Sequence, residues 1–326
     1  MKELMAVNQL SSVGDFAGVE TIVNQWIVES DIAPLTQKSY RTAAKVFVNW
    51  LSDNEVELTE TSLIDYREWL KLNRSTSSAK LYFTICKKLT AWLAKRGYIA
   101  RNFADGLKGI KLDTSVHARD ALTLDESVDV LNAMTGKTEK ALRDKCIMLL
   151  AFSCGLRAVE IVRLDVGDIE KRRGIWTARI WGKARAGKVD TIVIPDEVKA
   201  VIDRYLKVRG ELPKNAPLFS STSRRNFGQR IQTQNISRLA KRAFLNVGID
   251  SRRVVFHSVR HSQATLALEL GATLDEVSKN LRHKSIATTE IYRHDQQLFT
   301  NTATRIVAAA IFQRLKGVNI YGKKNG

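Results

Sequence analysis

Residues 257–261 read His-Ser-Val-Arg-His, and this short stretch carries the most informative combination of side chains in the chain. On a helix, His257 and Arg260 would lie three residues apart and on the same face. A histidine beside an arginine suits phosphate chemistry, because a guanidinium binds two oxygens while an imidazole exchanges protons near neutral pH. His257 and His261 also have the spacing of helical metal ligands. We expect no metal here, because the glutamate of the zinc protease motif is missing and Arg260 would repel a cation.

A second informative segment, residues 154–160, reads Cys-Gly-Leu-Arg-Ala-Val-Glu. It follows a strongly apolar run from Ala141 to Phe152, which predicts a buried helix. Gly155 is typical of a helix end, so Arg157 would begin the next element. Taken alone, an arginine in this position is more often structural than catalytic.

A β-hairpin is predicted farther along the chain. Residues 175–181 and 189–195 alternate in hydrophobicity and are rich in β-branched side chains, and the segment between them contains Gly182 and Gly187. Lys183 would lie at the end of the first strand, near the tip of the hairpin. A lysine there is usually just exposed to solvent, so its functional interpretation depends on what it faces.

The last informative segment, Leu281–Tyr292, reads LRHKSIATTEIY. Upstream of it, Thr273 and Glu276 have the spacing of a capping box, which predicts a helix that ends near His283. A turn would follow, and a threonine would cap a final element that carries Tyr292. A tyrosine beside an isoleucine is more often a buried aromatic, so Tyr292 alone decides nothing.

Together and in this order, these segments resemble the tyrosine recombinase (phage integrase) family. The family's catalytic domain has a leucine-threonine-acidic helix start, then Gly-Leu-Arg-x-x-Glu, a Gly-Lys pair on a hairpin, His-x-x-Arg-His, and Leu-x-His followed by Thr-Thr-x-x-Tyr. The matching stretches of this chain are 122–126, 155–160, 182–183, 257–261 and 281–292. The resemblance covers residues 121–315 by motif and residues 18–105 by helical pattern only.

Two departures from the family pattern stand out. The family usually has glycine before its second histidine, where this chain has Arg282. The hairpin tip also differs from the common Gly-Lys-Gly-x-Lys pattern, since residues 182–188 read GKARAGK. Lys183 is therefore the preferred catalytic lysine, and Lys188 remains the alternative.

The resemblance implies a reaction in which Tyr292 attacks a DNA phosphate, attaches to the 3′ phosphate and frees a 5′ hydroxyl. A covalent intermediate of this kind stores the energy of the bond for rejoining. His257 would assist the deprotonation of Tyr292, and Lys183 would protonate the departing 5′ oxygen.

The same resemblance assigns the groups that would stabilise the transition state. Arg157 and Arg260 would clamp the two non-bridging oxygens, a task for which planar guanidinium groups are well suited. His283 would donate a hydrogen bond to the phosphate, and Glu160, one helical turn from Arg157, would orient that arginine. With this much positive charge supplied by side chains, we expect neither a metal nor another cofactor.

The domain organisation follows from helical patterning and from the resemblance. Residues 1–17 form a lead-in, residues 18–105 a helical core-binding (SAM-like) domain, residues 106–120 a linker, and residues 121–326 the catalytic domain with a C-terminal helix and tail. The predicted fold is mainly α with a small β-hairpin (α+β). The resemblance implies that the two domains close around DNA as a C-shaped clamp.

The charge of the chain points to a polyanionic partner. Its 326 residues include 52 Lys and Arg against 34 Asp and Glu, a formal net charge of +18. A field of that sign attracts nucleic acid. Three cysteines in apolar runs predict buried free thiols and a reducing compartment. Without a signal pattern or a membrane-length apolar stretch, we expect a cytoplasmic, nucleoid-associated protein and no membrane partner.

Basic side chains on two segments are candidates for DNA contact. The run 224–242 contains no acidic residue, and its Gln, Asn, Ser and Thr side chains suit phosphates and base edges, although a solvated basic helix face is the plainer interpretation. A further pair lies on the helix expected around residues 80–92. The candidates are Lys80, Lys87, Arg224, Arg225, Arg230, Arg238, Lys241 and Arg242.

By resemblance, the partner is double-stranded DNA with inverted core recognition sites, bound by a homotetramer on two sites. The amphipathic segment Thr304–Leu315 would dock on a neighbouring protomer or pack on its own domain. A type IB topoisomerase, which uses a similar residue set as a monomer, and a non-catalytic DNA-binding protein are the rival interpretations. Whether the biological task is integration, excision, resolution or inversion is left open.

Overall fold

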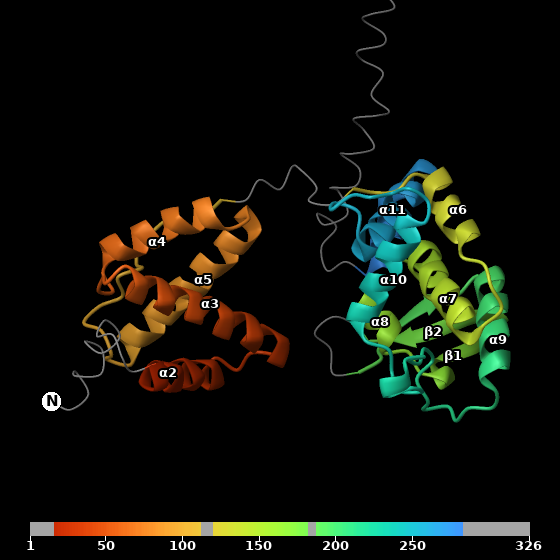
Figure 1. Cartoon of the computed structure of the whole chain (residues 1–326), viewed down its shortest axis with the longest axis horizontal. Helices are drawn as coiled ribbons and strands as arrows, with labels where there is room; N and C mark the ends of the chain where they lie inside the picture. The colour runs from red at the N-terminus through yellow and green to blue at the C-terminus, as the bar shows by residue number, and fades with distance from the viewer. Residues whose placement is uncertain (1–15, 112–119, 182–186, 283–326) are drawn as a thin grey trace, which may run out of the picture. The chain divides into compact units, whose positions relative to one another are not determined.

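Two units make up the chain, residues 1–114 and residues 115–326, and each has a hydrophobic core of its own. The computed structural model describes residues 16–111, 120–181 and 187–282, which are the coloured parts of Figure 1. Within these residues no helix combines the length and the apolar character that a bilayer crossing requires.

The first unit is built from helices, as the sequence predicted. They are α2 (Phe16–Glu29), α3 (Pro34–Asp53), α4 (Glu60–Asn73) and α5 (Thr76–Lys95). Helix α3 begins at Pro34, because proline suits the first turn of a helix. The side chains spaced three and four residues apart on α3, among them Tyr40, Ala44 and Phe47, are buried in the core of this unit.

Part of the predicted linker belongs to the first unit. Ile110 is buried in the core of that unit, and Leu107 packs against it. The half-buried Lys87 of α5 donates a hydrogen bond from Nζ to the backbone carbonyl of Leu107. Lys87, a candidate for DNA contact, thus holds the segment that follows α5 against that helix.

The second unit is mainly helical with a small sheet. Its elements are α6 (Leu124–Ala133), α7 (Glu139–Cys154), α8 (Ala158–Val162), η1 (Val166–Asp168), β1 (Ile169–Arg172), β2 (Ile175–Ile180), β3 (Asp190–Val193), α9 (Asp196–Arg209), η2 (Arg224–Asn226), α10 (Thr233–Leu245), α11 (Phe256–Glu269) and α12 (Leu274–Leu281). The mixture agrees with the predicted α+β class.

Helix α7 is the centre of this unit. It packs against α9 and α11, and Figure 1 shows it between them. Most of its side chains from Cys146 to Cys154 are buried, as expected for a helix that is apolar all round. The three cysteines are free and buried, as predicted, and burial raises the pKa of the Cys146 and Cys154 thiols to about 12.

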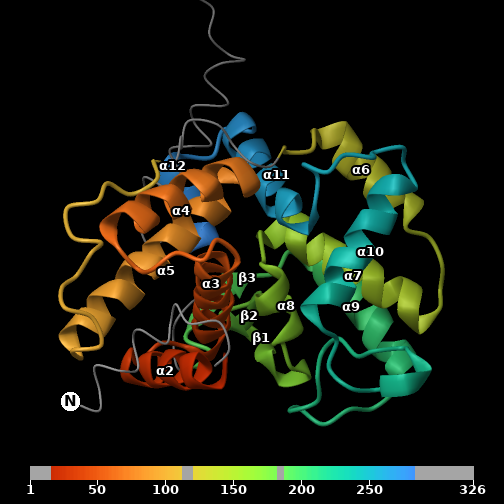
Figure 2. The same ribbon diagram turned by 60° about the vertical axis from the view of Figure 1, so that its left-hand side comes forward.

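The sheet has three antiparallel strands in the order β1-β2-β3, and lies beside α8 in Figure 2. The predicted hairpin is confirmed, since β2 pairs with β3 and Ile180 lies opposite Asp190. The sequence analysis missed β1, whose residues read Ile-Glu-Lys-Arg and offer little apolar alternation. Strand β1 exists because it pairs with β2, with Ile169 opposite Ala178.

The segment after α9 is more ordered than the sequence suggested. Residues 220–226 read SSTSRRN and are typical of a polar loop, yet Leu218 and Phe219 just before them are fully buried in the core. Two isolated bridges hold this segment, one between Asp165 and Pro217 and one between Ser220 and Arg230. These bridges order a segment whose own sequence is polar.

Candidate active site

The turn between α7 and α8 positions the first predicted catalytic arginine. Gly155 ends α7 with φ +63°, the left-handed conformation that favours glycine. A Cβ at this position would lie 2.6 Å from Cδ2 of Leu281 and 3.0 Å from Oε1 of Gln263, so only glycine fits. Arg157 then occupies the N-cap of α8, with a side chain that is 25% exposed.

Arg260 ties three of the predicted motif segments together. It lies on α11, and its side chain is among the largest that are fully buried. One terminal nitrogen donates a hydrogen bond to the carbonyl of Gly155, and the other donates to the carbonyl of Leu281. Removing a buried guanidinium from such acceptors is costly, so these bonds fix the spacing of α7, α11 and α12.

A buried carboxylate links two further arginines. Glu160 is 2% exposed, and its Oε1 accepts a hydrogen bond from Nη1 of Arg157 at 2.7 Å. Its Oε2 accepts from the backbone N–H of Arg157 at 2.8 Å and from Nη2 of Arg282 at 2.9 Å. Both oxygens of the carboxylate are therefore used to hold arginines.

Arg282 was noted in the sequence only as a departure from the family pattern. It caps the C-terminus of α12 with φ 54° and ψ 46°, a conformation that costs a residue other than glycine roughly 1–2 kcal/mol. Its side chain is 12% exposed, and Nη1 donates to the carbonyl of Asn280 at 2.6 Å. Burial lowers the pKa of Arg282, and Glu160 opposes that effect. The guanidinium remains a cation, because arginine does not lose its proton in proteins.

The two histidines of the 257–261 motif differ in exposure. His257 lies in the first turn of α11 and is exposed, whereas His261 is buried. Within the described ranges, no group of three or more His, Cys, Asp and Glu side chains is arranged to hold a metal ion. The predicted site residues Lys183, His283 and Tyr292 lie outside the described residues.

Lys188, the alternative to Lys183, is held inside the fold. Its Nζ donates to Oδ2 of Asp165 at 2.5 Å and also to Oδ2 of Asp168. Only 17% of its side chain is exposed. Arg230 approaches the same cluster, donating to Asp165 and to the carbonyls of Val162 at 2.8 Å and Leu164 at 3.0 Å.

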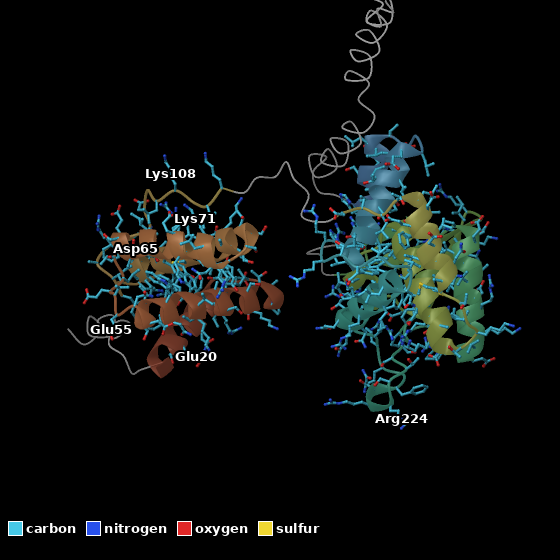
Figure 3. All side chains as sticks on the ribbon, turned by 45° about the horizontal axis from the view of Figure 1, so that its top comes forward. Glu20, Glu55, Asp65, Lys71, Lys108 and Arg224 are labelled. Carbon is cyan, nitrogen blue, oxygen red and sulfur yellow. The ribbon has the colours of Figure 1, made fainter. Side chains whose placement is uncertain are left out.

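The remaining candidates for DNA contact have different surroundings. Lys80 is exposed on α5, and Arg224 and Arg225 are exposed on η2. Figure 3 shows Arg224 on a turn that projects from the body of its unit. Lys241 pairs with Asp250 at 2.6 Å in an exposed ion pair, the kind that adds little stability.

A basic hollow of about 610 Å³ lies between the N-terminal end of α7, the segment 221–223 and α10. Its lining combines cations with hydroxyl groups and an amide. The lining residues are Lys140, Arg143, Ser221, Thr222, Ser223, Asn235, Arg238, Leu239, Lys241 and Arg242. None of these described lining residues is acidic, so the hollow favours an anion.

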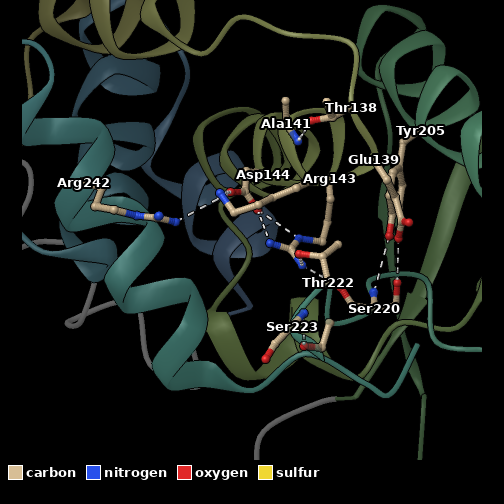
Figure 4. Close-up of polar contacts among 12 residues, drawn as sticks. Thr138, Glu139, Ala141, Arg143, Asp144, Tyr205, Ser220, Thr222, Ser223 and Arg242 are labelled. Atoms are coloured by element: carbon tan, nitrogen blue, oxygen red, sulfur yellow. Dashed lines mark hydrogen bonds and ion pairs between the residues drawn. The ribbon is translucent and has the colours of Figure 1, made fainter. Parts of the chain in front are cut away.

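The carboxylate of Asp144 contacts three of the cations that line this hollow. Oδ1 of Asp144 accepts from Nε and Nη2 of Arg143, at 2.9 and 2.6 Å. Lys140 and Arg242 approach Oδ2 of Asp144 at 3.4 and 3.9 Å, and Figure 4 shows Arg242 reaching toward Asp144 from α10. Arg143 also donates to the carbonyl of Ser220 at 2.7 Å. A single negative charge thus orients three positive ones.

The sequence analysis did not single out Lys140 and Arg143. Their spacing of three residues, just before the apolar part of a helix, was the available signal. Their partners in the hollow come from α10 and from residues 221–223, which are distant in sequence.

Comparison with known proteins gives one family. The model of the phage integrase family matches residues 121–298. The chain is 29% identical over 291 residues to tyrosine recombinase XerC of Shewanella amazonensis, covering 84% of this chain and 90% of that protein. It is 24% identical over 291 residues to tyrosine recombinase XerD of Staphylococcus epidermidis, covering 85% and 94%.

Solved structures with the same fold include the XerH site-specific recombinase bound to a palindromic difH substrate in a post-cleavage complex. That match has a TM-score of 0.72 at 18% identity and covers 94% of this chain and 88% of that one. A lambda integrase dimer bound to a COC′ core site matches with a TM-score of 0.64 at 19% identity, covering 83% and 96%.

The Asp165 cluster predicts a pH dependence of stability. Burial alone would raise the pKa of Asp165, but hydrogen bonds from Lys188 and Arg230 hold that pKa below its usual value. A lowered folded-state pKa contributes stability above the unfolded-state pKa of about 4, and this contribution is lost as the pH falls through the folded-state value. The difference in free energy of unfolding between the wild type and Asp165→Asn should therefore stay constant from pH 7 to about pH 4 and shrink below it.

Urea unfolding at a series of pH values measures this difference. Asp250→Asn, which removes the exposed partner of Lys241, serves as the control and should show a much smaller effect. An Asp165→Asn variant as stable as the wild type at pH 7 would contradict the assignment.

Proposed function

Because this chain belongs to the phage integrase family of tyrosine recombinases, we propose that it cleaves DNA through Tyr292 and rejoins it by way of a 3′-phosphotyrosine intermediate. The chain is a site-specific recombinase. The proposal adds that strands are exchanged through a Holliday junction, by a homotetramer that holds two sites with inverted core sequences. It also adds that the DNA belongs to a mobile element, a plasmid or the chromosome.

The observation that carries the proposal is the arginine cluster around Glu160. Arg157 and Arg260 come from segments 103 residues apart (260 minus 157), and both are anchored around Gly155, Glu160 and Leu281. The chain continues from Leu281 directly toward His283 and Tyr292. This arrangement supports a site in which the arginines and the tyrosine act on one phosphate.

The chemistry of such a site follows from charge. Phosphodiester cleavage spreads negative charge over the non-bridging oxygens, and donors fixed in advance stabilise that charge without reorganising. Arg157 is the arginine with an accessible edge, and we propose that it meets one oxygen while Arg260 supports the other. His257, exposed at the start of α11, would assist the deprotonation of Tyr292, and His283 would donate to the phosphate.

The surroundings of Lys188 favour Lys183 as the general acid. Lys188 binds two carboxylates, those of Asp165 and Asp168, and would have to leave them to reach the leaving oxygen. Lys188 instead fastens the start of β3 to the segment before β1, which supports the hairpin. Lys183, in the sequence that joins β2 to β3, is then proposed to protonate the 5′ oxygen.

The basic hollow is proposed to bind a backbone phosphate of the same duplex. Helix α7 has 16 residues, so at 1.5 Å per residue its two ends are roughly 24 Å apart. The hollow lies at its N-terminal end and Arg157 just beyond its C-terminal end. For a duplex that runs parallel to α7, at about 3.4 Å per base pair, we therefore propose that the bound phosphate lies about seven base pairs from the scissile phosphate.

The covalent intermediate is the first prediction of the proposal. A nicked suicide substrate that contains the native site should yield a protein–DNA band on a denaturing gel without added metal. The band should be absent in Tyr292→Phe, because the phenol oxygen is the nucleophile. Tight DNA binding without any covalent band from the wild type would favour a non-catalytic DNA-binding protein.

The choice of general acid gives a second prediction. Lys183→Ala should slow cleavage strongly on normal DNA and much less on DNA with sulfur in place of the 5′ bridging oxygen, because a thiolate leaves without a proton. Lys188→Ala should show no such selective rescue, since its role is to hold Asp165 and Asp168. Rescue of Lys188→Ala alone would exchange the two assignments.

The hollow gives a third prediction. Arg238→Ala and Arg242→Ala should each weaken DNA binding, and the slope of log K against log salt should become less steep by about 0.9 for each phosphate that the variant no longer binds. Arg204→Ala on α9, an exposed arginine that does not line the hollow, is the matched control. Salt slopes equal to that of the control would remove the hollow from the DNA interface.

A further inference from the structure

Arg282 stands where the pattern of this family usually has glycine, and its backbone shows why glycine would be easier. The residue caps α12 in the left-handed region with φ 54°. Glycine adopts this conformation without strain, whereas a residue with a Cβ does not. A strained arginine at this position calls for a compensating interaction of its side chain.

The side chain of Arg282 turns inward rather than toward solvent. It is 12% exposed and lies beside Glu160, which is 2% exposed. Nη2 donates to Oε2 of Glu160 at 2.9 Å, while Arg157 donates to Oε1 at 2.7 Å. The three side chains therefore form a chain in which the carboxylate lies between two guanidinium groups.

This chain has two physical effects on Arg157. Together with the backbone N–H of Arg157, Arg282 holds Oε2 and restricts rotation of the carboxylate, so that Oε1 keeps a fixed position beside Nη1 of Arg157. The second effect is electrostatic, because one carboxylate cannot neutralise two cations. Arg157 and Glu160 alone sum to zero charge, and Arg282 brings the sum to +1 (two arginines less one glutamate) in a poorly solvated place.

We propose that Arg282 is a positioning residue, which holds Glu160 and leaves the positive charge of Arg157 available to the scissile phosphate. The proposal rests on the proposed function, since it assumes that Arg157 meets that phosphate. In this proposal Arg282 acts through Glu160 and not on the substrate, since its side chain is 12% exposed and its Nη2 donates to Glu160.

The test compares single-turnover cleavage of the suicide substrate by the full-length wild type, Arg282→Gly and Arg282→Lys. Arg282→Gly should be about tenfold slower, at equal DNA occupancy. Its thermal midpoint should change little, because relief of backbone strain offsets the removal of the ion pair. Arg282→Lys keeps the charge and should recover most of the rate.

A second measurement separates positioning from mere structural support. A methylphosphonate at the cleavage position removes the negative charge of one non-bridging oxygen, which is the charge that Arg157 would meet. The rate difference between the wild type and Arg282→Gly should then nearly vanish. A purely structural role for Arg282 would slow cleavage of both substrates equally.

A double-mutant cycle with Glu160→Gln adds a third readout. If Arg282 acts through Glu160, the variant with both changes should be no slower than Glu160→Gln alone, since coupled residues are not additive. Independent effects that multiply would overturn the proposal.

The outcomes also distinguish this proposal from the one on which it rests. No covalent band from the wild type would overturn both. A normal band from the wild type, with an unchanged rate in Arg282→Gly, would overturn only the role of Arg282. A slower rate accompanied by an equal slowing on methylphosphonate DNA would reduce Arg282 to a structural residue.

Discussion

The buried guanidinium of Arg260 is the interaction on which the rest of the site depends. It binds the carbonyls of Gly155 and Leu281, the first residues of two of the predicted catalytic segments, 155–160 and 281–292. Helix ends leave carbonyls without partners inside the helix, and here one side chain satisfies a carbonyl at two such ends. Gly155 allows this because a Cβ would collide with Leu281. The side chain of Arg260 thus joins the two segments through their backbone carbonyls.

Around this joint the unit gathers positive charge. Glu160 is shared by Arg157 and Arg282, and the terminal nitrogens of Arg260 donate to backbone carbonyls. Such a cluster is costly to fold, because burial disfavours each charge. In the proposed reaction, a phosphate with developing negative charge would relieve that cost. The charge that destabilises the free protein would then stabilise the proposed complex, as expected where binding energy is directed at a transition state.

Local rules predicted much of this fold. The capping box of Thr273 and Glu276, the helix end at Gly155 and the β2–β3 hairpin each depend on a few neighbouring residues, and the structure has all three. Strand β1 was missed because its residues Ile-Glu-Lys-Arg lack apolar alternation, although its partner β2 follows directly. The burial of Leu218 and Phe219 was missed because one of the bridges beside them joins Asp165 to Pro217, far apart in sequence. The same holds for the candidate site. The order of the motifs predicted Arg157 and Arg260 as site residues, but it did not predict the contact between Arg282 and Glu160, which are far apart in sequence.

The basic residues show why charge in a sequence is a poor guide to DNA contact. Arg230 looked equivalent to Arg238 and Arg242, yet it has two carbonyls and a carboxylate within reach and holds the fold. Lys87 likewise holds a backbone carbonyl. A cation becomes available to a partner only where local acceptors are fewer than donors, as around Asp144, where three cations share one carboxylate. The fold therefore shows which Lys and Arg side chains are used in contacts within the protein, because it shows how many acceptors surround each of them. Those with few acceptors are the better candidates for binding a polyanion.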